Sequence, residues 1–399
     1  MKVLVLDTIH GGKEIGSAFA SAGLTVDTVD VYRNSSAVDV HTASMKSYDL
    51  VVAPVHLDPR HTLLRAQKAP VISHHEAVRM LLAGDVPHPM VEITGAQGKT
   101  TTAEALASAM VGCGILQSSR GLFRYPGEEI ISRLSITPAS VLPAAKAAAE
   151  IGGWLIAEES LGVTGAGHLA ILTSDKTYRI AAGSRDARGQ KIQSLRFCRQ
   201  VLLAPGIVCD LPGAIHAEDA ADLDGITCRI TTEHRTGSFS NSLLAREEFR
   251  IPLVLAGTAA CMLGLDPSVL SDFRGVEGRM SVRKEGGIVI VDNANSGTNR
   301  ETTIAAARLA REESGNPAIT LVIGIEEGKV CEGFPEDEIA DTVIRIQPEQ
   351  VVIVGDVVRP SLLPPGIRIC TAPSLGEARD AAMGSAGHGS VVLAVKTWR

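Results

Sequence analysis

The stretch at 91–102 constrains the fold of this chain more than any other part of the sequence, and it reads Val-Glu-Ile-Thr-Gly-Ala-Gln-Gly-Lys-Thr-Thr-Thr. Residues 90–93 form a short apolar strand pattern before the loop, and residues 102–110 have Ala and Leu at helical spacing after it. A strand, a glycine loop and a helix N-terminus together form a phosphate cradle, because backbone N–H groups and the helix dipole point at the anion. The order of these segments predicts a nucleotide-binding α/β domain.

The residues of this loop have separate roles in phosphate binding. Gly95 and Gly98 permit the tight backbone, Lys99 is expected to reach the terminal phosphates, and the Thr100 hydroxyl can bind Mg²⁺. The loop is one residue shorter than the full G-x-x-x-x-G-K-[ST] pattern, and an incidental glycine turn is the alternative interpretation. The flanking strand and helix favour nucleotide binding. The predicted nucleotide-binding residues of this segment are Thr94, Gly95, Ala96, Gln97, Gly98, Lys99, Thr100 and Thr101.

A second apolar run ends in acidic residues. Residues 154–157 (Trp-Leu-Ile-Ala) read as a buried strand, and Glu158-Glu159-Ser160 follow directly at its carboxyl end. A carboxylate in that position can bind Mg²⁺ opposite the glycine loop, directly or through water. The alternative is a pair of surface glutamates after a strand. The abrupt change from apolar to acidic residues favours the metal role, so Thr100 and Glu158 are the predicted magnesium ligands.

The first part of the chain predicts a small open parallel sheet. Strand patterns at 2–6, 25–31 and 50–53 alternate with helical segments, and ligands of such sheets bind outside the carboxyl ends of the strands. The loop after the first strand is therefore the local candidate for substrate contact, through His10, Gly11, Gly12 and Lys13. Seven of the eleven histidines fall before residue 89, either as solvated loop residues or as contacts to a metal-bearing or anionic ligand.

Basic residues are concentrated in two segments of an otherwise acidic chain. The glycine-rich stretch 112–127, expected to be a substrate-facing loop, contains Arg120 and Arg124, and the segment 179–199 contains Arg185, Arg188 and Lys191. A solvated charged face is one interpretation. The other is a clamp that binds a polycarboxylate through bidentate pairs. The sequence leaves both interpretations open.

The last third predicts a second open parallel sheet. A strong strand pattern at 287–291 ends in Asp292, a helix is expected at 300–313, and further strands are expected at 320–324, 351–355 and 390–395. Between the two sheets, strands at 169–173, 201–204 and 226–231 precede an apolar helix at 251–265.

Composition excludes several classes of protein. A length of 399 residues predicts two or three domains, and an aromatic content of 3% implies a core of Val, Ile, Leu and Ala. A net charge of −7 argues against nucleic-acid or anionic-membrane partners. The longest apolar run is too short to span a bilayer, and no secretory signal is visible at the N-terminus. Seven cysteines without a C-x-x-C spacing fit reduced thiols, so a cytoplasmic location is expected.

These motifs, in this order, resemble the Mur ligase superfamily, which includes folylpolyglutamate synthetase. The loop at 94–102 matches the T-G-T-N-G-K-T-T-T loop of that superfamily, and Glu158-Glu159-Ser160 matches its E-x-S magnesium segment. Arg279 and the segment Asp292-Asn293-Ala294-Asn295 match the arginine and the D-[DY]-A-H-N-P segment that opens the third domain of the superfamily. The resemblance covers the whole chain.

The resemblance implies an α/β fold with a three-domain Mur ligase-like architecture of open parallel sheets around a central P-loop ATPase domain. The implied domains are 1–88 (Rossmann-like, substrate), 89–279 (P-loop, ATP) and 280–399 (Rossmann-like). It implies that ATP and Mg²⁺ drive carboxylate activation through an acyl phosphate, with Arg279, Asp292 and Asn295 contacting the nucleotide. By position, Lys191 corresponds to the carbamylated lysine of the superfamily. The chain departs from the superfamily at Asn295-Ser296-Gly297, which replaces His-Asn-Pro.

Within this superfamily, the opening segment at 5–13 and the variant loop Gly-Ala-Gln-Gly at 95–98 are most similar to the coenzyme F(430) synthetase family of methanogenic archaea. That similarity implies a polyanionic nickel tetrapyrrole as substrate, with nickel present only as part of the substrate. A side-chain carboxylate would be activated, and a ring carbon would attack it to close a carbocyclic ring. No amino-acid co-substrate is needed in such a reaction.

The mechanism expected from the sequence places Lys99, Glu158 and Arg279 at the phosphates. His10 and His168 are the candidates for the base that removes the carbon-bound proton. Two alternatives stay open, an amide ligase that adds an amino acid to a carboxylate and a nucleotide-binding regulator without ligase activity. The sequence also leaves self-association open.

Overall fold

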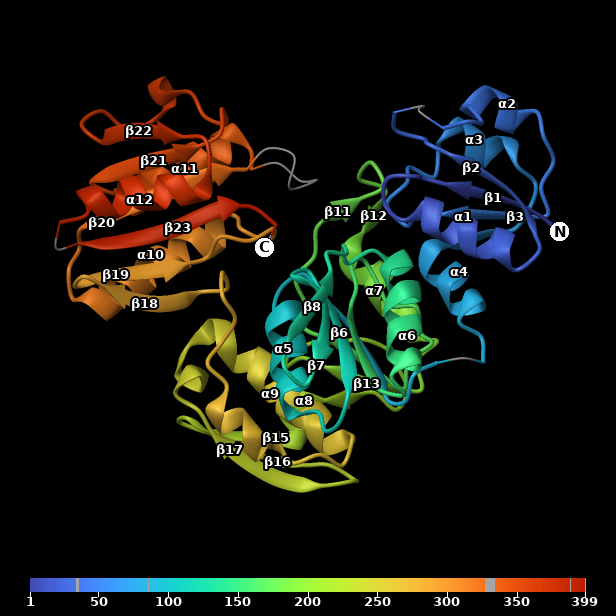
Figure 1. The fold of residues 1–399 in the computed structure, drawn as a ribbon, viewed down its shortest axis with the longest axis horizontal. Helices are drawn as coiled ribbons and strands as arrows, with labels where there is room; N and C mark the ends of the chain where they lie inside the picture. Colours follow the sequence, from blue (N-terminus) through green and yellow to red (C-terminus); the bar gives the residue numbers. More distant parts are fainter. Residues whose placement is uncertain (34–35, 85, 327–333, 388, 399) are drawn as a thin grey trace. The chain divides into compact units, whose positions relative to one another are not determined.

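The computed structural model describes residues 1–33, 36–84, 86–326, 334–387 and 389–398. The described chain forms two compact units, residues 1–273 and residues 274–399, which Figure 1 shows as ribbons coloured along the sequence. The division of the first unit into a substrate domain and an ATP-binding domain remains a prediction.

The first sheet of unit 1 is parallel and has the strand order β2-β1-β3-β4. Its strands are β1 (Lys2–Leu6), β2 (Thr25–Val29), β3 (Leu50–Ala53) and β4 (Val71–Ser73). The helices connecting and following them are α1 (Gly12–Ser21), α2 (Val40–Ser44), α3 (Thr62–Ala66) and α4 (His74–Leu81). The connection after β1 leads to β2 on one side of β1, and the connection after β2 leads to β3 on the other side of β1. This change of direction creates a crevice at the carboxyl ends of β1 and β3, where open α/β sheets bind ligands.

The central sheet of unit 1 has the strand order β14-β13-β10-β5-β9-β6-β7-β8. Its parallel part consists of β5 (Met90–Thr94), β6 (Gly114–Ser118), β9 (Trp154–Glu158), β10 (Leu169–Leu172), β13 (Gln200–Leu203) and β14 (Ile215–His216). An antiparallel edge is added by β7 (Gly121–Tyr125) and β8 (Glu129–Ser132). Because the central strands are covered on both faces, they read as continuous apolar runs.

Helices and small sheets complete unit 1. The helices are α5 (Lys99–Ala109), α6 (Val141–Glu150), α7 (Ala187–Leu195), α8 (Ala217–Ala220) and α9 (Glu247–Met262), with 3₁₀ turns η1 (Pro138–Ser140), η2 (Ser242–Ala245) and η3 (Pro267–Asp272). A short hairpin is formed by β11 (Arg179–Ile180) and β12 (Arg185–Asp186). An antiparallel sheet is formed by β15 (Ala221–Asp224), β16 (Thr227–Thr231) and β17 (Thr236–Ser240).

One hydrophobic core joins the first sheet to the central sheet. Val5 and Phe19 of the first sheet and its helix belong to the same buried cluster as Ala144 of α6 and Leu155 of β9. Gly11 precedes α1 with a φ of 98°, and a Cβ atom at this position would lie 2.5 Å from the Cβ atom of Ala139. The two sheets of unit 1 are therefore packed together through α1, α4, η1 and α6.

Unit 2 contains a sheet of order β18-β19-β23-β20-β21-β22. Its strands are β18 (Ser281–Glu285), β19 (Ile288–Asp292), β20 (Ile319–Ile325), β21 (Gln350–Val354), β22 (Arg368–Ala372) and β23 (Ser390–Lys396). Its helices are α10 (Arg300–Ser314), α11 (Glu336–Ile346) and α12 (Leu375–Ser385), with the 3₁₀ turn η4 (Pro360–Leu362). Figure 1 shows α12 on one face of the sheet, with α10 and α11 on the other.

The predicted α/β fold with open parallel sheets is confirmed, with antiparallel additions at the edges. In unit 2, β18 and β19 are joined by Gly286 and Gly287, both with positive φ, and this type of tight turn produces an antiparallel pair. The prediction of a loop at 112–127 is wrong, because β6 and β7 form a hairpin there. The predicted strand at 226–231 exists as β16, but it belongs to the separate antiparallel sheet.

Two further sequence expectations concern the chain as a whole. Among the described residues, every helix is too short or too polar to span a lipid bilayer. The cysteines that the structure describes are free thiols, namely Cys113, Cys198, Cys209, Cys228, Cys261 and Cys370. Cys331, and Asp85 at the start of the segment that precedes β5, lie outside the described residues.

Candidate functional site

The glycine loop between β5 and α5 has the backbone geometry that its sequence predicts. Gly95 has a φ of 150°, and a Cβ atom there would lie 2.1 Å from Thr173 Oγ1. Gly98 is the N-cap of α5 with a φ of 82°, in the left-handed region that favours glycine. The Thr173 hydroxyl donates to the Gln97 carbonyl at 2.5 Å. The loop is thereby fixed against β10, and the N-terminus of α5 is presented at the carboxyl end of β5.

Three neighbouring parallel strands deliver the polar residues around this loop. Thr100 Oγ1 donates a hydrogen bond of 2.9 Å to Glu158 Oε2, at the end of β9. The backbone N–H of Ser119, just after β6, donates to the same oxygen at 3.0 Å, and the Ser119 hydroxyl lies 3.1 Å from Thr100 Oγ1. Lys99 Nζ donates to the Gly95 carbonyl at 3.1 Å and lies 3.8 Å from Glu158 Oε1. We call these four residues, Lys99, Thr100, Ser119 and Glu158, the phosphate edge.

The donor atoms of the phosphate edge fit a magnesium ion. Mg²⁺ prefers oxygen ligands and is usually bound through one or two protein oxygens plus phosphate oxygens and water. A threonine hydroxyl and a carboxylate oxygen converge here, and the Glu158 side chain is only 2% exposed. A bound Mg²⁺ at this point would supply positive charge beside the phosphates. Sequence reasoning missed Ser119, whose only signal is its position directly after a buried strand.

Lys191 lies on α7 with its side chain buried. Its Nζ atom has no hydrogen-bond partner among the described residues and lies 5.0 Å from the centre of the Tyr178 ring. Burial, together with the nearby charge of Lys99, lowers the pKa of the Lys191 amine to about 8, although Asp186 acts in the opposite direction. The neutral amine is the form that reacts with CO₂, and a lowered pKa increases the neutral fraction of the Lys191 side chain. The environment of Lys191 therefore fits the lysine carbamate that the resemblance implies.

Directly after Glu158, Glu159 is fully buried and lies next to Glu92. Burial raises the pKa of the Glu159 carboxyl well above its ordinary value, and the charge of Glu92 and a hydrogen bond with it add to the shift. Glu92 in turn accepts hydrogen bonds from the backbone N–H groups of Thr164 and Gly167, both at 2.8 Å. This pair of buried carboxyl groups fixes the loop that precedes β10. Sequence reasoning missed Glu92, although an acid inside an apolar strand pattern is a visible signal.

The structure places the predicted arginines in different environments. Arg120 and Arg124 are on the hairpin of β6 and β7, where Arg120 donates to Glu104 at 2.8 Å and Arg124 lies 3.6 Å from Glu129. Arg188 is tied to the Asp175 carboxylate and donates to the Val208 carbonyl at 2.7 Å.

Arg185 lines a cavity between the first sheet and residues 161–197. The cavity has a volume of about 490 Å³. Arg185 Nη1 donates to the Val55 carbonyl at 3.3 Å, which joins the loop after β3 to the hairpin of β11 and β12. Arg185 is the one arginine proposed for substrate binding that lines this cavity. Its described contacts also include no carboxylate of the protein. Its guanidinium is therefore suited to an anionic ligand.

The loop after β1 holds the residues predicted to meet the substrate. His10 Nδ1 lies 2.6 Å from Asp7 Oδ2, and hydrogen bonding to this carboxylate raises the pKa of the His10 imidazole. Gly11 and Gly12 are buried, and a Cβ atom at Gly12 would lie 2.0 Å from the Asp7 carbonyl oxygen, so tight packing explains both glycines. Lys13 is exposed in the first turn of α1.

The structure does not bring His168 to the phosphate edge. His168 precedes β10, and its Nδ1 atom accepts the N–H of Met90 at 3.1 Å, at the amino end of β5. Its other ring nitrogen lies 2.8 Å from Nδ1 of His88. Because Lys99 and Glu158 lie at the carboxyl ends of the strands, His168 occupies the opposite edge of the central sheet and stays outside the site that we propose.

Unit 2 contains its own cluster of predicted residues. Arg279 Nη1 donates to Asn295 Oδ1 at 2.8 Å, and Asn295 Nδ2 donates to the Gly278 carbonyl at 2.7 Å. Asp292 is buried at the end of β19, with Arg283 Nη2 at 3.5 Å from its carboxylate. The turn that replaces the His-Asn-Pro of the resembled family thus holds Arg279 through the side chain of Asn295.

Comparison with known proteins agrees with the fold and with the motifs. Residues 282–397 match the family described as coenzyme F430 synthetase CfbE, C-terminal domain. The chain is 32% identical to coenzyme F(430) synthetase of Methanosarcina acetivorans, in a match that covers 89% of this chain and 90% of that protein. Among solved structures, E. coli FolC in complex with DHPP and ADP is similar with a TM-score of 0.59 and 16% identity, covering 81% of this chain and 89% of that one. A UDP-N-acetylmuramoylalanyl-D-glutamyl-2,6-diaminopimelate–D-alanyl-D-alanyl ligase from Acinetobacter baumannii has a TM-score of 0.56 and 14% identity, covering 91% and 89%.

The class of protein follows from this agreement. The chain is an ATP-dependent ligase with the fold of the Mur ligases and folylpolyglutamate synthetase. Within that class, it belongs to the coenzyme F(430) synthetase family. The resemblance predicted from the glycine loop, the E-x-S segment and the opening residues is confirmed.

Proposed function

We propose that this chain activates a side-chain carboxylate of a nickel tetrapyrrole as an acyl phosphate and closes a carbocyclic ring by forming a carbon–carbon bond. This reaction would be the last step of coenzyme F(430) biosynthesis. The observation that carries the proposal is the 32% identity to the Methanosarcina acetivorans coenzyme F(430) synthetase over 89% of the chain. ATP with Mg²⁺ is the proposed energy source, and nickel enters only as part of the substrate.

The proposed reaction has two chemical steps. A carboxylate oxygen of the substrate attacks the γ-phosphorus of ATP, and ADP leaves. A carbon of the same substrate then attacks the acyl carbon, so that a carbon–carbon bond forms and the bond to phosphate breaks. The proton on the attacking carbon is transferred to a base. Overall, ATP is converted to ADP and phosphate, and the substrate loses the elements of one water.

The residues of the phosphate edge have positioning and electrostatic roles in the proposal. Lys99 and the loop amides bind the β- and γ-phosphates, while Thr100 and Glu158 would hold Mg²⁺. The resemblance assigns Arg279 to the transferred phosphoryl group, and we retain that role. Lys99, Mg²⁺ and Arg279 would stabilise the negative charge that develops on the transferred phosphoryl group. Electrostatic stabilisation of this kind is commonly the largest catalytic contribution in such sites.

A carbamate on Lys191 is a further part of the proposal. Its support is a buried amine with a pKa lowered to about 8 and with the positive Lys99 nearby. Carbamylation would replace a buried positive charge with an anion beside Lys99, which removes the unfavourable interaction between two ammonium groups. A carbamate oxygen is also a hard ligand of the kind that Mg²⁺ prefers.

The substrate in this proposal is a polyanion, and Arg185 is its best-supported contact. Arg185 lines the cavity of about 490 Å³ between the first sheet and residues 161–197. A carboxylate of the substrate would form a charge-assisted hydrogen bond with this guanidinium. His10 and Lys13 remain proposed contacts on the side of the first sheet. Arg120, Arg124 and Arg188 are proposed with less structural support, because each lies near a carboxylate of the protein.

Release of ADP tests the proposal. The tetrapyrrole acid alone should cause stoichiometric release of ADP and phosphate, and the rate should be unchanged when amino acids are added, because the attacking carbon belongs to the substrate. An amide ligase, the fold-level alternative suggested by FolC and the Mur ligases, would release ADP only in the presence of an amine. Dependence of ADP release on an added amino acid would overturn the proposed ring closure.

A further inference from the structure

A second group of polar residues lies at the carboxyl ends of β1 and β3 in the first sheet. Asp7 directly follows β1, His10 lies in the loop between β1 and α1, and His56 lies in the loop after β3. These two strands pair in parallel, and the chain changes direction between them in the order β2-β1-β3-β4. The group, which we call the histidine edge, therefore occupies the topological switch point of this sheet, where such sheets bind ligands.

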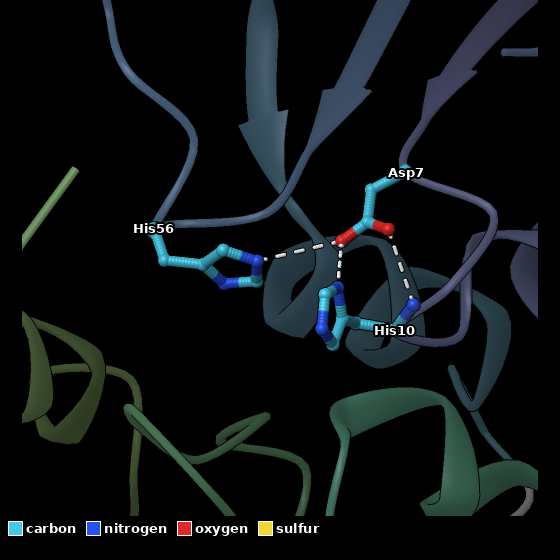
Figure 2. A group of neighbouring side chains, drawn as sticks. All are labelled: Asp7, His10 and His56. Atoms are coloured by element: carbon cyan, nitrogen blue, oxygen red, sulfur yellow. Dashed lines mark hydrogen bonds and ion pairs between the residues drawn. The ribbon is translucent and has the colours of Figure 1, made fainter. Parts of the chain in front are cut away.

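The ligand atoms of the histidine edge converge on one oxygen. Asp7 Oδ2 lies 2.6 Å from His10 Nδ1 and 3.4 Å from His56 Nε2. Figure 2 shows both ring nitrogens directed at this same carboxylate oxygen from two different loops. The three residues each offer one ligand atom, and all three atoms lie within 4.8 Å of one another. Atoms bound to one ion at about 2.1 Å lie at most about 4.2 Å apart, so only a small adjustment would be needed.

Other contacts fix the positions of these side chains. Asp7 Oδ1 accepts the backbone N–H groups of Ile9 at 2.9 Å and of His10 at 3.1 Å, which leaves Oδ2 for the imidazoles. The Tyr32 ring stacks on His56 at an interplanar angle of 12° and meets His10 edge-on. The Asp7 side chain is fully buried, whereas His10 and His56 are 32% and 27% exposed. The group thus has a buried anionic side and an accessible outer side.

His56 distinguishes a metal site from simpler roles of this loop. Its Nε2 atom is buried and lies 3.4 Å from Asp7 Oδ2, within ion-pair distance but without the geometry of a well-formed hydrogen bond. A general base formed by Asp7 and His10 would need no second imidazole. If the role of Asp7 were only to stabilise the turn after β1, its contacts with the His10 ring and with the backbone N–H groups of Ile9 and His10 would be sufficient. A bound cation would use all three residues.

We propose that Asp7, His10 and His56 bind one divalent transition-metal ion through two imidazole nitrogens and one carboxylate oxygen. This donor set suits Zn²⁺, Co²⁺ or Ni²⁺, whereas Mg²⁺ prefers oxygen ligands only. The exposed side of the site leaves further coordination positions open to an anionic oxygen ligand. This site is separate from the phosphate edge, and it does not depend on the nickel that the proposed substrate carries.

Binding of the metal alone tests the proposal. Tag-free, metal-stripped protein is titrated with Co²⁺ in excess Mg²⁺, and binding is followed by visible absorption and calorimetry. We expect one equivalent of Co²⁺ to bind, with d–d bands of imidazole coordination, and Zn²⁺ but not Mg²⁺ to displace it. His10→Ala and His56→Ala should each weaken binding by roughly a hundredfold or more, since even second-shell changes cost 10- to 100-fold. Asp7→Asn, which keeps the acceptor for the backbone N–H groups, should also weaken it.

The matched control is His88→Ala, because His88 and His168 form the other close histidine pair, at 2.8 Å, in the part of the chain that the structure describes. This variant should bind Co²⁺ like the parent. The proposal is overturned if the parent binds no Co²⁺ saturably, or if His10→Ala and His56→Ala both bind it as tightly as the parent while circular dichroism shows them folded. Neither result requires ATP or the tetrapyrrole, so the ring-closure proposal can fail or succeed independently.

Discussion

The phosphate edge and the histidine edge have the same position in their sheets but present different chemical groups to a ligand. Both lie at the carboxyl ends of neighbouring parallel strands, and both combine a buried carboxylate with groups from the following loops. At the phosphate edge, Glu158 receives a hydroxyl and an amide and lies near an ammonium group. At the histidine edge, one imidazole nitrogen lies 2.6 Å and another 3.4 Å from the Asp7 carboxylate. The topology places the carboxylate, and the residue types in the loops select the ligand.

The two edges also differ in how firmly their side chains are held. Thr100 and Glu158 are almost fully buried within unit 1, while the histidine rings are partly exposed. A buried, preorganised edge suits phosphoryl transfer, where stabilisation of developing charge needs fixed groups. An accessible edge suits a site that exchanges its ligands. Substitutions at the two edges and in their surroundings separate these roles, from the largest expected effect to the smallest.

Removing the charge or the carboxylate at the phosphate edge should have the largest effect. Lys99→Ala and Glu158→Ala are each expected to lower the rate of ADP release by about a hundredfold or more, the usual loss for a transition-state electrostatic contact. Circular dichroism should show both variants folded. Lys146→Ala on the exposed face of α6 is the control and should keep the parent rate. A loss of only a few-fold in both site variants would remove the phosphate and magnesium assignments.

Lys191→Ala should lower turnover by roughly tenfold or more if the lysine carries a carbamate that contributes to the phosphate edge. A pH test sharpens this expectation. The pKa of the amine is lowered to about 8, so the neutral form that reacts with CO₂ increases as pH rises through that value. Parent enzyme depleted of CO₂ should therefore regain activity faster at about pH 9 than at about pH 7 when bicarbonate is added so that dissolved CO₂ is equal at the two pH values. Activity that is indifferent to bicarbonate at both pH values would exclude a functional carbamate.

Arg185 lies next to the loop that carries His56, so it tests whether the substrate extends between the two edges. Arg185→Ala should raise KM for the tetrapyrrole by roughly tenfold, which corresponds to about 1.4 kcal/mol, and leave KM for ATP unchanged. Arg188→Ala is the matched comparison, because Arg188 is occupied by Asp175 and Val208. It should raise KM much less. A KM of Arg185→Ala equal to that of the parent would mean that Arg185 does not contact the substrate in this cavity.

The smallest effect is expected at Glu159, next to Glu158, and concerns the pH dependence of folding stability. Its pKa is raised in the folded protein, so the folded state holds a proton that the unfolded state releases above its ordinary pKa. The stabilisation from this proton is complete below about pH 4.5 and is lost as pH rises through the folded pKa. Glu159→Gln cannot titrate but keeps a donor for Glu92.

The stability of the parent relative to Glu159→Gln, and with it the Tm difference between them, should therefore fall between about pH 5 and about pH 8. Thermal unfolding at the two pH values measures this difference. Glu150→Gln, at an exposed position of α6, is the control and should follow the parent. If the Tm difference between the parent and Glu159→Gln is the same at both pH values, Glu159 does not hold an extra proton in the folded state.

The sequence was sufficient for the parallel strands and for the loop of the phosphate edge, because both depend on local patterns. Gly95 and Gly98 indicate the backbone of the loop, and the apolar run before Glu158 indicates its strand. The sequence was insufficient for Ser119, Glu92 and the pairing of His10 with His56. These depend on which strands become neighbours, and β9 pairs with β5 although about 60 residues separate them in the chain. The hairpin of β6 and β7 was missed because its glycines and arginines are also typical of loops.

The mass of the substrate after turnover tests the central claim most directly. The tetrapyrrole acid is incubated with ATP, Mg²⁺, the enzyme and a mixture of amino acids, and the product is examined by mass spectrometry. Ring closure through an acyl phosphate predicts a product lighter than the substrate by one water, with ADP and phosphate formed in equal amounts. A product that has gained an amino-acid residue, or hydrolysis of ATP with no change in the mass of the substrate, would contradict it.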